Sequence, residues 1–227
     1  MRLEVTDLRK SFVSPSGERV EVLRGISFST RGGQAVAITG PSGSGKTTLL
    51  NLIGGLETPD HGSIVAGDFA IDSASETSLA RFRQTQVGFV FQFHHLLADL
   101  SAIENAALPL AIGRMKWHEA QARAGRSLEM NGLGDRMTHA VRHLSGGEQQ
   151  RVAVCRALIT NPSLVLADEP TGNLDPDLAL EISKTMVDYA RNDGATVILA
   201  THNEALAQLC DGILRLTDGK LSEGSNW

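Results

Sequence analysis

The chain has few cysteines, no long apolar run and no basic cluster, and each shortage excludes a class of protein. Its two cysteines, Cys155 and Cys210, are too few for a disulfide scaffold and lack the spacing of metal ligands. No apolar stretch approaches the ~18 residues of a membrane-spanning helix. Glu4 stands where a signal peptide would carry its apolar segment. We therefore expect a protein of the reducing cytosol.

The charge balance argues against a further class, the proteins that bind nucleic acid. The chain of 227 residues carries 21 Lys and Arg against 26 Asp and Glu, a net charge of −5, with no Lys/Arg block. We therefore expect no nucleic-acid partner. The length allows one large domain or two small ones, and no low-complexity linker divides it.

Hydrophobic patterning predicts an α/β fold whose first third is rich in strands. Strands are predicted at 3–13, 20–29 and 64–71, and a hairpin at 212–221 around Asp218-Gly219. A helical pattern covers 100–130, where Ser101 and Glu104 form a capping box. Further helices are predicted at 48–53, 149–159 and 177–193.

Four short, almost continuously apolar runs predict parallel strands that are buried on both faces. They cover residues 35–39, 87–91, 164–167 and 196–201. Polar residues follow each run: a glycine-rich loop, then Gln92, then Asp168-Glu169, then His202. Since ligands bind at the carboxyl ends of such strands, we expect these groups to form one site.

The first of these loops fits the phosphate-binding pattern G-x-x-x-x-G-K-[ST]. It reads Gly40-Pro41-Ser42-Gly43-Ser44-Gly45-Lys46-Thr47, and Thr48 opens the apolar helix that follows. Backbone N–H groups of such a loop surround phosphate oxygens, the lysine contacts the β- and γ-phosphates, and the hydroxyl at Thr47 can ligate Mg²⁺. A plain glycine turn before a helix is the alternative, and the strand–loop–helix context favours phosphate binding.

Two adjacent acids follow the third buried run. We assign Asp168 to the metal and Glu169 to polarising an attacking water, because neighbouring side chains at a strand end diverge. Solvated loop acids are the alternative. We also predict Gln92 as a metal ligand and catalytic group, and His202 as a catalytic group. These two assignments are based mainly on the sheet edge that both residues share with the other polar groups.

The string Leu144–Arg151 suggests a second phosphate-binding element. Ser145 and Glu148 form a capping box for a helix, but a cap alone does not require Gly146-Gly147. Two glycines before a helix predict a second anion-binding nest formed by Ser145, Gly146 and Gly147.

Together these motifs resemble the ATP-binding cassette (ABC) family over essentially the whole chain, 1–227, which would then be one ATP-binding domain. The resemblance implies a P-loop NTPase core with a mainly parallel sheet, an N-terminal antiparallel β region and an inserted helical subdomain. It identifies 40–47 with Walker A, 164–168 with Walker B, 144–148 with the signature and 171–175 with the D-loop. It also implies ATP and Mg²⁺ as ligands, and a homodimer in which each signature faces the partner's P-loop.

Finer features resemble the lipoprotein-releasing and macrolide-export ATPases of that family, and His94-His95 favours the former. This implies a peripheral subunit on the cytoplasmic face of the inner membrane, bound to an integral permease. The family usually stacks adenine on a tyrosine, and the match here is Phe12, for which a strand-end core residue is the alternative. The apolar segment 93–97 predicts the permease contact, with core packing as its alternative.

Two other functions compete with transport. A non-transport ABC ATPase of DNA repair, chromosome organisation or translation would carry a long heptad coiled coil or a second cassette, and the sequence has neither. A small-molecule kinase would leave 144–148 unexplained. Asp135, His139 and His143 share a spacing that could ligate a metal on a helix, but a solvated helix face is favoured.

Overall fold

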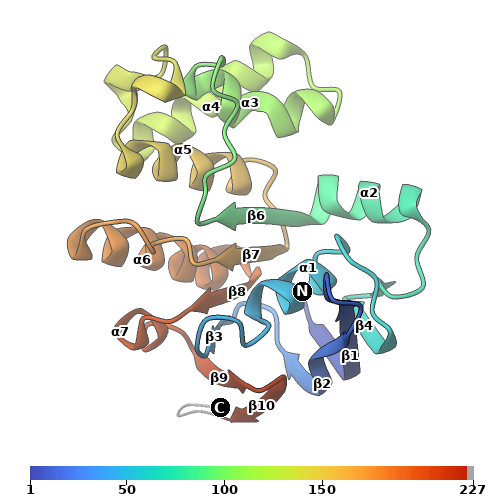
Figure 1. Ribbon diagram of the computed structural model, residues 1–227. Helices are drawn as coiled ribbons and strands as arrows, with labels where there is room; N and C mark the ends of the chain where they lie inside the picture. Colours follow the sequence, from blue (N-terminus) through green and yellow to red (C-terminus); the bar gives the residue numbers. More distant parts are fainter. Residues whose placement is uncertain (224–227) are drawn as a thin grey trace.

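The computed structural model describes residues 1–223 as two sheets and the helices around them (Figure 1). The strands are β1 (Leu3–Val13), β2 (Arg19–Thr30), β3 (Ala35–Thr39), β4 (His61–Ala66), β5 (Phe69–Ala70), β6 (Val87–Phe91), β7 (Leu164–Asp168), β8 (Thr196–Thr201), β9 (Gly212–Thr217) and β10 (Lys220–Glu223). The helices are α1 (Lys46–Ile53), α2 (Glu76–Gln86), α3 (Ala102–Ile112), α4 (Trp117–Met130), α5 (Gly146–Leu158), α6 (Pro176–Asp193) and α7 (Glu204–Ala207), with 3₁₀ turns at Gly134–Arg136 and Val141–His143.

One sheet is antiparallel and the other is mostly parallel. The antiparallel sheet has the order β2-β1-β4-β5, and the second has the order β10-β9-β3-β8-β7-β6. In the second sheet only β10 runs antiparallel to its neighbour. The four apolar runs of the sequence are the strands β3, β6, β7 and β8, which confirms the predicted α/β class with its N-terminal antiparallel region.

Alternate residues of the parallel strands enter two different cores. In β3, Val36 and Ile38 pack with α1 and the antiparallel sheet. Ala35 and Ala37 face the opposite side, where α6 and α7 cover the sheet. Both faces are therefore buried, and this explains why these strands are apolar throughout instead of alternating with polar residues.

Helices α3, α4 and α5 form a separate layer with its own apolar core, at the end of the molecule away from the antiparallel sheet (Figure 1). The Ser101–Glu104 capping box opens α3, as predicted. The predicted helical stretch 100–130 is broken between Gly113 and Lys116, where the chain turns into α4. This layer is inserted between β6 and β7, in agreement with the expected helical subdomain.

Several boundaries differ from the sequence-based expectations. The single strand predicted at 64–71 is the hairpin of β4 and β5, because Gly67 takes a positive φ of 60° and reverses the chain. Helix α5 begins at Gly146, not Gln149, and α1 begins at Lys46, not Thr48. Helices α2 and α7 were not predicted. Within residues 1–223, no helix combines the length and apolar character needed to cross a membrane.

Candidate functional site

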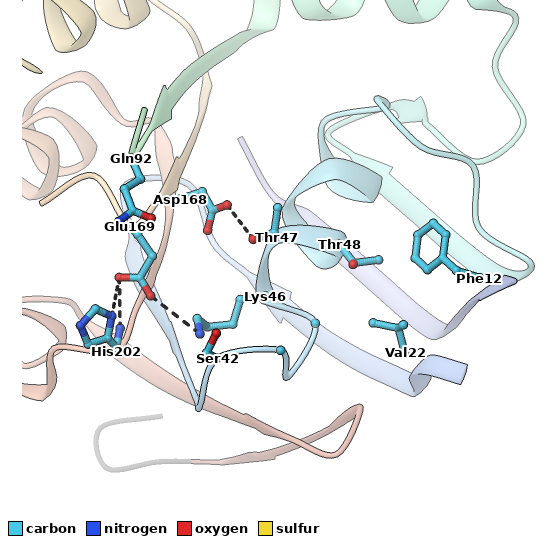
Figure 2. Close-up of a pocket in the computed structure, with 12 residues that line it drawn as sticks. Phe12, Val22, Ser42, Lys46, Thr47, Thr48, Gln92, Asp168, Glu169 and His202 are labelled. Atoms are coloured by element: carbon cyan, nitrogen blue, oxygen red, sulfur yellow. Dashed lines mark hydrogen bonds and ion pairs between the residues drawn. The ribbon is translucent and has the colours of Figure 1, made fainter. Parts of the chain in front are cut away.

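The carboxyl ends of β3, β6, β7 and β8 border a cavity of about 750 Å³. Its lining residues come from the loop after β3 and the start of α1, from the ends of the other three strands and from the antiparallel sheet (Figure 2). They are Phe12, Val22, Ser42, Gly43, Gly45, Lys46, Thr47, Thr48, Gln92, Asp168, Glu169 and His202. The structure therefore brings together groups that lie up to 190 residues apart in the chain.

The loop before α1 depends on glycines at positions that no other residue could occupy. A Cβ on Gly40 would lie 2.1 Å from the carbonyl oxygen of Leu216. Gly45 precedes α1 with a φ of 104°. Lys46 is 8% exposed and folds back on the loop, donating to the carbonyl oxygens of Gly40 at 2.9 Å and Pro41 at 3.2 Å. The loop thus holds an ammonium group and free helix N–H groups against the cavity.

Thr47 and Asp168 meet although 121 residues separate them. The Thr47 hydroxyl donates to Asp168 Oδ2 at 2.7 Å. The other carboxylate oxygen, Oδ1, is buried and has no hydrogen-bond partner in the described part of the chain. Burial raises the pKa of Asp168, the Thr47 hydrogen bond lowers it, and the negative charge of Glu169 raises it further. A divalent cation would satisfy the unpaired oxygen, so this hydroxyl–carboxylate pair fits Mg²⁺.

Glu169 points away from its neighbour Asp168, as the sequence predicts for adjacent strand-end acids. It takes a positive φ of 45°, and its N–H donates to the carbonyl oxygen of Ala200 on β8 at 2.9 Å. Glu169 Oε2 lies 3.0 Å from His202 Nδ1, and Oε1 lies 3.7 Å from Lys46 Nζ. A positive φ strains the backbone of a non-glycine residue, so the surrounding interactions must hold Glu169 in this conformation. Backbone strain of this kind is typical of functional sites.

Gln92 follows β6 directly and lies above the two acids (Figure 2). A Cβ added to Gly172 would lie 3.0 Å from its side-chain nitrogen. Because glycine has no side chain, Gly172 leaves space for the Gln92 amide. This contact joins the end of β6 to the turn after Glu169.

Phe12 and Val22 line the opposite end of the cavity from His202 (Figure 2). Phe12 is 39% exposed, which excludes the alternative of a core residue at the strand end. Val22 was not predicted. Lys10 pairs with Leu23 and Ser11 with Glu21, so Val22 is the extra residue of a β-bulge. A bulge changes the direction of one side chain, and the strand pattern alone does not reveal it.

The remaining predicted residues lie outside the lining of this cavity. Gly40, Pro41 and Ser44 belong to the loop before α1, and within residues 1–223 the buried Ser44 hydroxyl has no hydrogen-bond partner. Ser145, Gly146 and Gly147 lie at the start of α5 in the helical layer. Ser145 and Glu148 form the predicted capping box there, and Arg136 pairs with Glu148 at 3.0 Å.

The two glycines of this element differ in their surroundings. A Cβ on Gly146 would meet open space, whereas one on Gly147 would lie 2.3 Å from the Leu178 side chain of α6. Gly147 therefore serves packing, and both glycines are helical residues, not a loop before the helix. The exposed N–H groups at this end of α5 remain available to an anion.

Two other features of the sequence do not contribute to a site: the spaced residues Asp135, His139 and His143, and the cysteine Cys155. Asp135, His139 and His143 do not share a helix face, since only short 3₁₀ turns occur there. Over residues 1–223, no group of three or more His, Cys, Asp or Glu is placed to hold a metal ion. Cys155 is 1% exposed, and burial raises its pKa to about 11, as expected for an inert thiol.

Comparison with known proteins identifies relatives of this site and fold. A family model described as ABC transporter matches residues 23–172. The lipoprotein-releasing system ATP-binding protein LolD of Geobacter metallireducens is 46% identical, over 96% of this chain and 97% of its own length. The protein of the same name from Pseudomonas syringae pv. tomato is 45% identical, over 97% of each chain.

Solved structures agree with the sequence relatives. An ATP-binding cassette, determined as a dimer in a post-hydrolysis state bound to ADP and Pi, superposes with a TM-score of 0.91. It is 35% identical and covers 97% of both chains. A second dimeric structure of a bacterial ABC transporter cassette superposes equally well. The chain therefore has the fold of these cassettes.

Proposed function

The chain belongs to the ABC transporter family and is one of its ATPases, and from that premise we propose that it energises a membrane permease for lipoprotein release. The observation that carries the ATPase assignment is the cavity at one sheet edge, which gathers Lys46, the Thr47–Asp168 pair and the Glu169–His202 pair. The resemblance to LolD proteins along almost the whole chain supports lipoprotein release. The non-transport alternative is not favoured.

We assign each group by the charge or proton that it can handle. Lys46 neutralises the β- and γ-phosphates of ATP, and the loop N–H groups hold their oxygens. Thr47, Asp168 and Gln92 would hold Mg²⁺, which when bound would spread the charge of the transferring phosphoryl group. Phe12 and Val22 at the other end of the cavity hold the adenine.

Glu169 acts as the general base in this proposal. Its carboxylate takes the proton of the attacking water, and His202, 3.0 Å away, orients it. The contact between Lys46 and Glu169 at 3.7 Å also supports this role, because phosphate binding to Lys46 would leave the carboxylate free for water. The family further implies a homodimer, in which Ser145, Gly146 and Gly147 face the phosphates of the partner's nucleotide.

A second cavity supports the membrane partner. It has a volume of about 540 Å³ and lies between α2, α3, α5 and the segment after β6, with Leu97, Leu108 and Ile112 in its lining. Leu97 is 53% exposed and Ile112 is 65% exposed. We propose that a cytoplasmic helix of the permease occupies this groove and that the subunit lies on the cytoplasmic face of the inner membrane.

The Glu169→Gln variant tests the ATPase mechanism. Because glutamine keeps the shape but accepts no proton, we expect ATP to bind normally while turnover falls about 10²–10⁴-fold. The measurement is phosphate release with Mg²⁺, beside ATP binding by the same sample. Glu129→Gln, an exposed acid of α4, serves as the matched control. Parent-level turnover in Glu169→Gln would remove this residue from the chemistry.

A further inference from the structure

Helix α5 contacts the backbone on both sides of Gln92. Before Gln92, the carbonyl oxygen of Phe91 accepts a hydrogen bond from Gln150 Nε2 at 3.4 Å. After it, Arg156 donates from Nη2 to His94 O at 2.8 Å and from Nη1 to His95 O at 2.6 Å. The segment that carries Gln92 is therefore attached to one helix at two points.

Packing alone does not explain a glutamine at position 150. Gln150 is 1% exposed, and its Oε1 atom is buried with no hydrogen-bond partner among residues 1–223. An apolar side chain of similar size would fill the same space and leave no polar atom unsatisfied. The one contact that a glutamine adds here is the one to Phe91, the residue before Gln92.

Arg156 shows the same pattern at the other end of the helix. Its guanidinium is half-buried, and within residues 1–223 no carboxylate lies at ion-pair distance from it. Its partners are two backbone carbonyls instead, and one of them belongs to His95, which has a positive φ of 48°. The ring of His95 also meets Phe91 edge-on, with ring centres 5.0 Å apart. The guanidinium thus holds a strained turn closed.

We propose that Gln150 and Arg156 are positioning residues that tie the Gln92 segment to α5, so that a shift of Gln92 is transmitted to Ser145. The two ties lie near the two ends of α5, and Ser145 caps its first turn. A helix held in this way moves as one body. The inference rests on the proposed function, in which Gln92 meets the chain's own nucleotide and Ser145 meets that of the partner. The ties would then link the two nucleotide sites within one subunit.

The test uses the full chain with Glu169→Gln as parent, so that an ATP-bound dimer persists. Gln150→Met and Arg156→Met remove the donors but keep most of the side-chain bulk. We expect affinity for a fluorescent ATP analogue to stay within about twofold, while the ATP-dependent dimer weakens about 5–150-fold, the usual range of coupling between sites. Sedimentation measures the dimer, and Arg156→Lys, which keeps a donor, should recover part of the loss.

The controls separate coupling from stability. Arg191→Met removes an arginine of α6 that donates to the carbonyl oxygen of Leu209 and pairs with Asp211, and it should leave the dimer unchanged. Gln150→Met should unfold at the parent's temperature or above, and it keeps the test valid if Arg156→Met does not fold. Normal dimerisation of Gln150→Met would overturn the proposal. Failure of the parent itself to bind ATP would instead overturn the proposed function.

Discussion

Asp168 and Glu169 are neighbours in the chain but experience different surroundings. Asp168 ends β7 with one oxygen on the Thr47 hydroxyl and the other buried and unpaired. Glu169 is turned by its positive φ toward Lys46 and His202. Of these two acids, as far as residues 1–223 show, only Asp168 has a buried oxygen without a hydrogen-bond partner. The free-energy cost of an empty site therefore falls mainly on that residue.

Asp168→Asn should therefore stabilise the protein while it removes Mg²⁺-dependent nucleotide binding. An amide still accepts the Thr47 hydrogen bond and carries no charge to desolvate or to repel Glu169. We expect the thermal midpoint without nucleotide to rise by about 1–3 °C near pH 7, a small shift because the carboxylate is only partly removed from solvent. Calorimetry with and without Mg-ATP measures both effects, and Asp177→Asn, a first-turn acid of α6, is the control.

The pH dependence of this gain has a defined sign. Burial raises the pKa of Asp168 above its usual value of 3.8 in the folded protein. Between those two values the folded state holds more protons than the unfolded state, so the parent loses stability as the pH rises through this window. The advantage of Asp168→Asn should vanish below pH 3.8 and be complete above the raised pKa. An advantage that persists in acid would contradict the burial argument.

At the scale of an element, the segment after β6 divides into a buried and an exposed part. Leu96 packs against the core of the helical layer, whereas Phe93 is 71% exposed and Leu97 is 53% exposed. Asn105, fully buried on α3, holds the segment from within by bonds to both the N–H and the carbonyl of Leu97. The core alternative therefore holds for Leu96, whereas the permease contact stays a prediction for the exposed residues Phe93 and Leu97.

His95→Glu combined with Leu97→Glu tests the exposed part. Both side chains line the apolar groove, so two charges there should abolish co-purification with the permease. ATP binding by the isolated subunit should stay near normal, because neither residue lines the nucleotide cavity. Trp117→Glu, which changes an exposed apolar residue of α4 outside the groove, is the matched control. A folded double variant that still binds its permease would place the contact elsewhere.

Sequence patterns gave some elements closely and missed others, for physical reasons. Strands β3, β6 and β8 have the predicted bounds, because burial on both faces leaves an unbroken apolar run. Helix α2 buries only Leu79 and Phe82 in its length, too weak a periodicity to detect. In the site, strand-end groups were predicted from topology, whereas Val22 depends on a bulge. The link between α5 and Gln92 involves backbone carbonyls, which no residue pattern encodes.

At the scale of the whole molecule, one copy holds two elements that we predict to bind phosphate, and these two elements do not meet. Lys46 lines the nucleotide cavity, whereas Ser145 lies on α5 outside its lining. If each cavity is completed by the partner's α5, mixing Lys46→Ala with Ser145→Arg should restore one site that has a sound loop and a sound signature. We expect nucleotide trapping in the mixture and none in either variant alone. Trapping by Ser145→Arg alone would show that one copy is sufficient.

The position of Ser145 outside its own chain's cavity has a consequence for ATP consumption in the cell. In the proposed dimer a lone copy is catalytically incomplete, so hydrolysis by free subunits follows second-order kinetics and becomes negligible on dilution. Specific activity in a test tube should rise with subunit concentration until dimers dominate. A permease that holds two copies side by side removes this dilution penalty. ATP hydrolysis is then confined to subunits that are bound to a permease, and surplus free subunits hydrolyse almost no ATP.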